Sequence, residues 1–256
     1  MIESVQAIRY VTPLREGGSL PGIVEADDCG TYVMKFRGAG QGVKVLVAEV
    51  VVGELARRIG LRVPELRAIL LDPAIGRYEA DEEVQDLLTA SVGLNLGVDF
   101  LPGSFGWDCN YAVDPDEAAD ILWLDAFTAN VDRSWRNPNV LIWHRQLWLI
   151  DHGAALYFHH GWTNGLGSPD KFARQPYDAR DHLLIEHADG VRDADARLSA
   201  LIDVEVLTDV LNQVPDEWID PVPGVAGADA VRRAYVNHLL ARLDSDRGWL
   251  PGRADR

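Results

Sequence analysis

Two short apolar runs in the middle of the chain, residues 140–143 and 147–150, constrain the fold most strongly. Only His144-Arg145-Gln146 separates them, so the pattern predicts a tight antiparallel hairpin. Polar residues flank both free ends of this hairpin, because a polar loop over residues 130–139 precedes it and Asp151-His152-Gly153 follows it. Antiparallel strands return the chain to its starting point, so we expect Asp151 to lie beside the end of that loop.

The polar loop carries the side chains that phosphoryl transfer requires. This chemistry needs a carboxylate that orients the attacking hydroxyl group, and oxygen ligands that hold Mg²⁺ on the phosphates. Asp132, Asn137 five residues later and Asp151 beyond the hairpin supply these groups. Taken alone, Asp and Asn in a loop are more often turn or cap residues. Here they follow Lys35 and Glu49 in the chain, and this order of five residues favours a role in phosphoryl transfer.

The first third of the chain has the pattern of strands and glycine turns. We expect strands where β-branched and aromatic residues gather between glycines, and one helix over residues 45–59 that Gly60 ends. The expected strands cover residues 4–12, 23–25, 31–36, 68–72 and 94–101. Pro102-Gly103 follows the last strand, and we place a lobe boundary there.

Helical patterns dominate the remainder of the chain. Asp114-Pro115-Asp116-Glu117 predicts a helix start, with Asp114 as N-cap and Glu117 completing a capping box. Helices are expected over residues 115–128, 180–187, 204–214 and 228–243, and residues 153–176 are expected to form a long segment without regular structure. The sequence therefore predicts an α+β fold with a strand-rich N-lobe, residues 1–102, and a helical C-lobe, residues 103–256.

The loop, the hairpin and the Asp-x-Gly turn together resemble the catalytic loop and metal-binding turn of HipA-like kinases. The match is best to the compact HipA-like domains common in actinobacteria, and it covers residues 10–157. It implies a two-lobed protein-kinase-like fold, with Asp132 as catalytic residue and with Asn137 and Asp151 as Mg²⁺ ligands. Asn139 directly precedes the hairpin and is an alternative metal ligand to Asn137.

The resemblance also assigns residues of the N-lobe. It implies that Lys35 binds the α- and β-phosphates of ATP, and that Glu49 pairs with this lysine and holds it extended and charged. A loop at Gly17-Gly18-Ser19 is expected to cover the phosphates, because glycine lets backbone N–H groups approach anions closely. The resemblance also makes Ser19 a candidate for autophosphorylation. Backbone groups around Phe100 and Leu101 are expected to meet the adenine.

Net charge, apolar segments and cysteine content restrict the classes of partner and the cellular compartment that we expect. A net charge of −16 disfavours nucleic acid and anionic membranes as partners. The first ten residues lack a signal-peptide pattern, and the most apolar window, residues 45–52, is short and interrupted by Glu49, so we predict a cytoplasmic protein. Cys29 and Cys109 suit a reducing compartment and are interpreted as structural thiols. The expected ligands are ATP, Mg²⁺ and a hydroxyl-bearing acceptor.

The chain contains eight tryptophans, and core packing is the default explanation for seven of them. Trp135 is the exception, because it lies between Arg133 and Arg136 in the expected catalytic loop.

Several functions remain open at this stage. By family analogy the acceptor is a protein serine or threonine, and a small-molecule or lipid hydroxyl is the nearest alternative. No histidine precedes the Asp132-Arg133 pair as in protein kinases, and His152 stands where they have phenylalanine. These departures motivate a second hypothesis, a pseudokinase that binds nucleotide and acts as a scaffold. A third is an interaction domain that binds no nucleotide.

Overall fold

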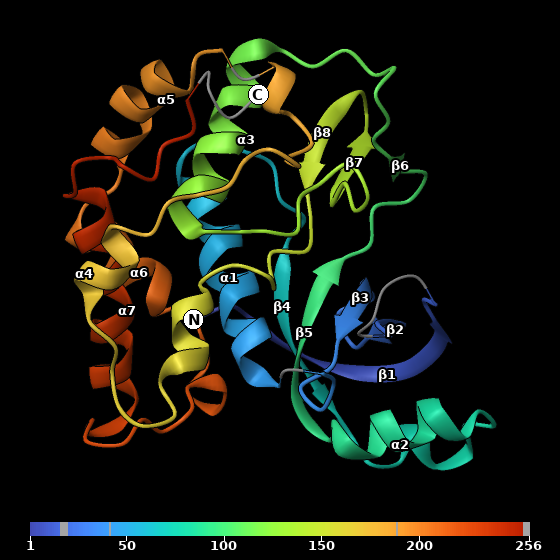
Figure 1. The fold of residues 1–256 in the computed structure, drawn as a ribbon. Coiled ribbons are helices and arrows are strands. Elements are labelled where there is room, and N and C mark those ends of the chain that lie inside the picture. Colours follow the sequence, from blue (N-terminus) through green and yellow to red (C-terminus); the bar gives the residue numbers. More distant parts are fainter. Residues whose placement is uncertain (16–19, 41, 188, 253–256) are drawn as a thin grey trace.

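The computed structural model describes residues 1–15, 20–40, 42–187 and 189–252 of the chain (Figure 1). The strands are β1 (Ser4–Pro13), β2 (Gly22–Ala26), β3 (Thr31–Lys35), β4 (Leu66–Leu71), β5 (Gly93–Asp99), β6 (Phe105–Gly106), β7 (Val140–Trp143) and β8 (Gln146–Leu149). The α-helices are α1 (Val43–Arg58), α2 (Glu82–Ala90), α3 (Pro115–Thr128), α4 (Pro169–Ala173), α5 (Val191–Leu198), α6 (Val204–Leu211) and α7 (Gly227–Leu243).

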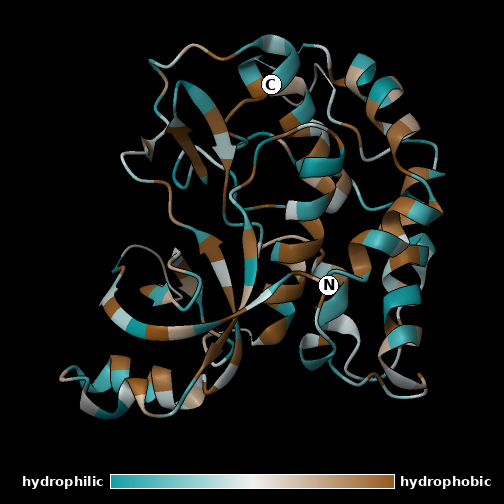
Figure 2. Cartoon of the chain, turned by 180° about the vertical axis from the view of Figure 1, so that it is seen from behind, coloured by the Kyte–Doolittle hydropathy of each residue, from teal (hydrophilic) through white to brown (hydrophobic). Residues whose placement is uncertain are grey.

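The N-terminal part is built on a closed barrel with the strand order β1-β2-β3-β5-β4. Neighbouring strands are antiparallel except for β1 and β4, which are parallel and close the barrel. The closing contact is short, because only residues 4–6 of β1 pair with residues 68–70 of β4. Alternating residues such as Val24, Met34 and Ile69 fill its interior, together with Val84 and Leu88 of α2. Figure 2 shows hydrophilic and hydrophobic residues in turn along α2, as expected for a helix with one buried face.

Helix α1 lies at the centre of the molecule, between the barrel and the C-terminal helices (Figure 1). Every residue from Leu46 to Gly53 is buried, which explains the apolar run seen in the sequence. Glu49 belongs to this run, and only 2% of its surface is exposed. A buried carboxylate in an apolar helix requires a partner of opposite charge or a set of hydrogen-bond donors. Glu49 is therefore expected to belong to a buried charged cluster.

The C-terminal part combines a small sheet, β6-β7-β8, with α3 to α7. The predicted hairpin is confirmed, with Val140 paired to Leu149 and Trp143 to Gln146. Its two turn residues, His144 and Arg145, both have positive φ, as a tight two-residue hairpin turn requires. Helix α3 begins as predicted, because the Asp114 side chain accepts hydrogen bonds from the first helical turn.

Several expectations for the C-terminal part were wrong. No α-helix covers residues 180–187; a 3₁₀ turn over Ile185–His187 stands there, because His182 forms an isolated β-bridge with Ser134. Residues 153–176, expected to lack regular structure, contain α4 and a 3₁₀ helix over Tyr157–Gly161. Helix α5 was not predicted, nor was α2 in the N-terminal part.

The cysteines and some of the tryptophans are less buried than the sequence predicted. Both cysteines are free and exposed, so neither is a packed structural thiol. Five tryptophans are buried as expected, namely Trp107, Trp123, Trp162, Trp218 and Trp249. Trp143 and Trp148 are half-buried, and Trp135 is exposed. Among the described residues, no helix is both long and apolar enough to span a bilayer.

Candidate active site

Lys35, Glu49 and Asp151 form an ion cluster that joins three distant parts of the chain. Lys35 is the last residue of β3, Glu49 lies on α1, and Asp151 follows β8. The Nζ atom of Lys35 lies 2.5 Å from Oε1 of Glu49 and 2.8 Å from Oδ1 of Asp151. The barrel, the central helix and the hairpin thus all contribute one side chain to the cluster.

The cluster is electrostatically coupled. Burial opposes the charge on Lys35, but the two carboxylates outweigh this effect and raise its pKa, so the lysine stays protonated. Burial opposes ionisation of Asp151, yet Lys35 lowers the pKa of this carboxyl to about 2. Burial raises the pKa of Glu49 to about 6 in spite of the lysine. Asp151 is the more exposed carboxylate, with 46% of its side chain accessible, which leaves it available to a ligand.

The Asp151-His152-Gly153 turn is held in an unusual conformation. Asp151 has φ 55°, in the left-handed region that non-glycine residues rarely adopt. A Cβ atom on Gly153 would lie 2.5 Å from Cγ1 of Val45 and 3.1 Å from Oε1 of Glu49. Glycine is therefore required there for packing, because α1 comes too close for any side chain.

His152 is fully enclosed and faces the loop that precedes the hairpin. Its Nδ1 lies 3.2 Å from Nη2 of Arg133, and its Nε2 is buried without a hydrogen-bond partner among the described residues. Burial and the positive charge of Arg133 lower the pKa of His152 to about 3. The ring is thus neutral, and Nδ1 accepts the hydrogen bond from the guanidinium group.

Arg133 connects the loop of residues 130–139 to both ends of the hairpin. It is 1% exposed, and its guanidinium group donates to the backbone oxygens of Asn139, before β7, and Ile150, after β8. Its Nε also donates to Oδ2 of Asp125 over 2.6 Å. One side chain thereby fixes the spacing between the two segments that carry the acidic residues.

Asp125 supports the loop before the hairpin and was not identified from the sequence. It is fully buried on α3 and contacts Arg133, Asn130 and His182. Burial opposes its ionisation, but Arg133 and His182 outweigh burial and hold the pKa of this carboxyl well below its usual range. The available signal was an aspartate inside the apolar run of residues 121–127, since a buried charge implies a buried partner.

Asp132 lies at the centre of hydrogen bonds within the loop. Nδ2 of Asn137 donates to Oδ2 of Asp132 over 2.8 Å. Nδ2 of Asn139 lies 3.3 Å from the backbone oxygen of Asp132 and 3.4 Å from its Oδ2. The structure therefore brings all three predicted loop residues together. Asn137 is exposed and Asn139 is buried with φ 49°.

The remaining predicted residues lie elsewhere. Phe100 and Leu101 occupy the connection between β5 and β6, where Phe100 is 41% exposed and Leu101 is buried. Gly17, Gly18 and Ser19, between β1 and β2, lie outside the described residues.

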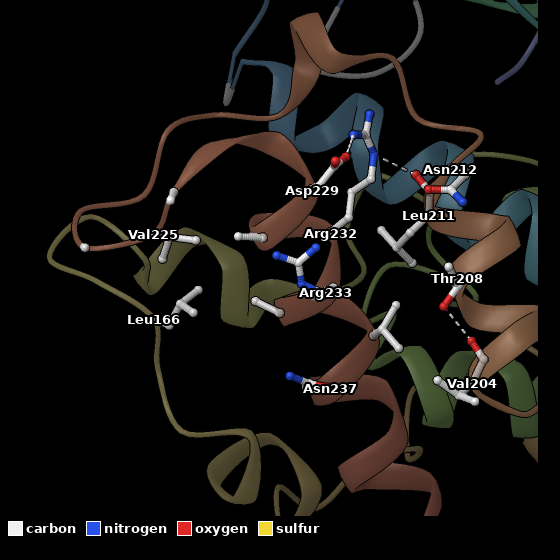
Figure 3. A pocket seen from close by; sticks show the side chains of 15 residues that line it. Leu166, Val204, Thr208, Leu211, Asn212, Val225, Asp229, Arg232, Arg233 and Asn237 are labelled. Carbon is white, nitrogen blue, oxygen red and sulfur yellow. Dashed lines mark hydrogen bonds and ion pairs between the residues drawn. The ribbon is translucent and has the colours of Figure 1, made fainter.

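A hollow of about 730 Å³ lies away from this cluster, between α6, α7 and the segment before α7 (Figure 3). Val204, Leu211 and Val225 line it together with Arg233 and Asn237. None of the residues discussed above for chemistry contributes to it, so it offers no support for the site.

Comparison with known proteins identifies the family and the fold. A family model described as HipA-like kinase matches residues 7–251, and the chain therefore belongs to the HipA-like kinase family. No curated protein matches the sequence. The solved structure of the Helicobacter pylori proinflammatory kinase CtkA is similar, with a TM-score of 0.56 and 12% identity over 94% of this chain and 95% of that one.

The Golgi casein kinase with Mn/ADP bound also matches, with a TM-score of 0.44 and 13% identity over 96% of this chain and 74% of that one. This second likeness is too weak to support an inference. The likeness to CtkA at 12% identity shows the fold alone. Together with the strand-rich N-terminal part and the helical C-terminal part, it confirms the predicted α+β, protein-kinase-like fold.

Proposed function

We propose that this HipA-like kinase transfers the γ-phosphoryl group of ATP to a serine or threonine hydroxyl in a Mg²⁺-dependent reaction. The observation that carries the proposal is the position of the Lys35 ammonium group between Glu49 and Asp151. A buried lysine kept charged and extended is suited to bind phosphate oxygens. Family membership supports the same reaction class.

Asp151 of the cluster and Asn137 of the loop fit a divalent cation bound with a nucleotide. Mg²⁺ is usually held by one or two protein oxygens together with phosphate oxygens, not by a complete protein cage. Asp151 offers a half-exposed carboxylate, and Asn137 offers an exposed amide whose nitrogen donates to Asp132. We assign these two residues to the metal, which would neutralise charge on the phosphates when bound.

Asn139 is assigned a positioning role in this proposal, although the sequence left it open as a ligand. Its side chain is buried and its amide nitrogen faces Asp132. Its backbone oxygen accepts hydrogen bonds from Arg133 and from the amide of Ile150. These contacts hold the start of β7 in place.

In the proposed transfer step, Asp132 acts on the acceptor hydroxyl group. The acceptor oxygen forms a bond to the γ-phosphorus while the bond from that phosphorus to the β–γ bridging oxygen breaks, and ADP leaves with the electron pair. Asp132 orients the acceptor hydroxyl and takes its proton. Phe100 and Leu101 are proposed to meet the adenine, and Gly17, Gly18 and Ser19 to cover the phosphates.

Transfer of label from γ-labelled ATP tests the proposal. The purified chain is incubated with Mg²⁺ and a mixture of serine- and threonine-containing peptides, beside Asp132→Ala and a matched control, Asp178→Ala. Asp178 is exposed and pairs with Arg180 on the surface. We expect transfer by the wild type and the control and none by Asp132→Ala. Nucleotide binding without transfer by the wild type would instead favour the pseudokinase hypothesis.

A further inference from the structure

The tip of the catalytic loop presents two exposed side chains, Trp135 and Arg136. Trp135 is 62% exposed, and Cζ of Arg136 lies 4.3 Å from the centroid of its ring. Among the described residues, the Arg136 guanidinium group has no hydrogen-bond or ion-pair partner. This stacking leaves the N–H edge of the guanidinium group free to bind an anion.

The backbone holds this tip in a defined conformation. The amide of Ser134 donates to the oxygen of Asn137 over 3.0 Å, and the amide of Asn137 donates back to the oxygen of Ser134 over 3.1 Å. Ser134 is also bridged to His182, which is itself anchored to buried Asp125. The two exposed side chains therefore project from an anchored turn.

An exposed apolar side chain also lies on the other side of Asp132 in the sequence. Val131, which directly precedes Asp132, is also 62% exposed. Large apolar groups that flank a proposed catalytic aspartate gain free energy when a partner covers them. Tryptophan and arginine are also the residue types that contribute most to binding at protein interfaces.

The exposure of Val131 and Trp135 favours a protein acceptor over a small molecule. Small-molecule ligands are usually enclosed by concave pockets, whereas Trp135 and Val131 are both largely open to solvent. A segment of a protein can cover such a surface, and a carboxylate on that segment can bind the planar guanidinium group through two hydrogen bonds. The net charge of −16 repels acidic partners at long range, but salt screens charges beyond about 10 Å, so the local contact with Arg136 decides whether a single acidic side chain binds.

We propose that Trp135 and Arg136 form an acceptor-recognition surface, and that the acceptor is a protein segment with an acidic side chain close to its serine or threonine. This inference rests on the function proposed above and adds the substrate class to it. Val131 and Trp135 contact the segment on either side of Asp132, and Arg136 selects the acidic side chain.

Two peptide pools test the inference. Both have a central serine or threonine, but one carries Asp and Glu in the flanking positions and the other carries Lys and Arg. We expect the wild type to prefer the acidic pool. Arg136→Gln should raise KM for the acidic pool about tenfold, the equivalent of one charge-assisted hydrogen bond, without raising KM for ATP. Arg136→Glu should reverse the preference.

Arg145→Gln is the matched control. Arg145 lies in the turn at the opposite end of the hairpin from Asn139 and Asp151, and removing its charge should leave the preference unchanged. Trp135→Ala is a second variant, for which KM should rise for both pools alike because stacking and apolar contact are lost.

Three results would overturn the inference. The first is equal phosphorylation of the two pools by the wild type. The second is an equal fall in kcat for both pools in Arg136→Gln, because this would place Arg136 on the nucleotide. The third is phosphorylation of neither pool by a chain that does phosphorylate the mixed serine and threonine peptides used above. That result would remove the role of charged flanking residues and leave the proposed function intact, whereas absence of transfer to any peptide would contradict the proposed function itself.

Discussion

The ammonium group of Lys35 lies 2.8 Å from a carboxylate oxygen of Asp151, although 116 positions separate the two residues in the chain. This contact joins the barrel to the end of the hairpin, and Glu49 completes it from the central helix. The three side chains depend on one another, because two are carboxylates and the buried lysine supplies the compensating charge.

Replacing Lys35 by Met should lower stability and abolish transfer, and a second substitution should recover stability alone. The change leaves Glu49 buried without its cation, so we expect the free energy of unfolding to fall by about 2 to 4 kcal/mol. Adding Glu49→Gln should recover part of this loss, because a neutral amide is less costly to bury, while phosphate transfer stays absent in both variants. Urea denaturation of the wild type, the single variant and the double variant measures the coupling. Equal destabilisation in the single and double variants would contradict it.

Replacing Gly153 by Ala should disturb the Asp-x-Gly turn through packing alone. The new methyl group would lie 2.5 Å from Val45, so we expect a loss of about 1 to 3 kcal/mol in the free energy of unfolding, together with a lower transfer rate. Val45→Ala in the same chain should restore part of both quantities. Gly161→Ala is the control, because a Cβ atom there meets no atom within 4 Å. No rescue by Val45→Ala would contradict the packing explanation.

Asn137 and Asn139 should respond differently to replacement by Ala. We expect Asn137→Ala to raise the Mg²⁺ concentration for half-maximal transfer by about tenfold or more, because one oxygen ligand is lost. Asn139→Ala should keep the Mg²⁺ dependence but lower the free energy of unfolding by about 1 to 2 kcal/mol, because Asn139 is buried at a positive φ. Titration of transfer against Mg²⁺, with a melting curve for each variant, distinguishes the two. The reverse pattern would make Asn139 the ligand.

The protein should lose stability below neutral pH in part through His152. Its pKa is lowered to about 3 in the folded chain, whereas an unfolded histidine titrates near its ordinary value of 6.5. Between these values the unfolded chain binds more protons, so stability falls as the pH decreases. We expect His152 to contribute a loss of about 2 kcal/mol between pH 6.5 and 5.

His152→Phe supplies the comparison for this pH effect. The variant removes the titrating group and keeps an aromatic ring, so the free energy of unfolding should depend less steeply on pH than in the wild type. Urea denaturation at several pH values measures both slopes. Identical slopes would show that His152 is not the titrating group.

Local sequence patterns predicted most of the elements near the site. The hairpin followed from two apolar runs around a three-residue gap, and the start of α3 from its Asp-Pro-Asp-Glu pattern. These signals are local, because turn and cap preferences depend on neighbouring residues. The expected helix over residues 180–187 was wrong because His182 forms a β-bridge with Ser134 and a hydrogen bond with Asp125. Tertiary contacts of this kind override helix propensity.

The sequence predicted the charged residues of the site but not the residues that hold them in place. Lys35, Glu49 and Asp151 were named from spacing and family resemblance, and the structure brings them together. Asp125 escaped notice because an aspartate in a helix usually faces solvent, and only the fold shows that Arg133 reaches it. The requirement for glycine at position 153 likewise depends on how closely α1 approaches the turn.

Calorimetric titration of ATP in the presence and absence of Mg²⁺, on the wild type and on Asp151→Ala, is the sharpest test of the proposed nucleotide site. We expect the wild type to bind ATP only with Mg²⁺, and the affinity to fall by about tenfold or more in the variant. Absence of ATP binding to the folded wild type would contradict the proposed function, as would equal affinity in the variant.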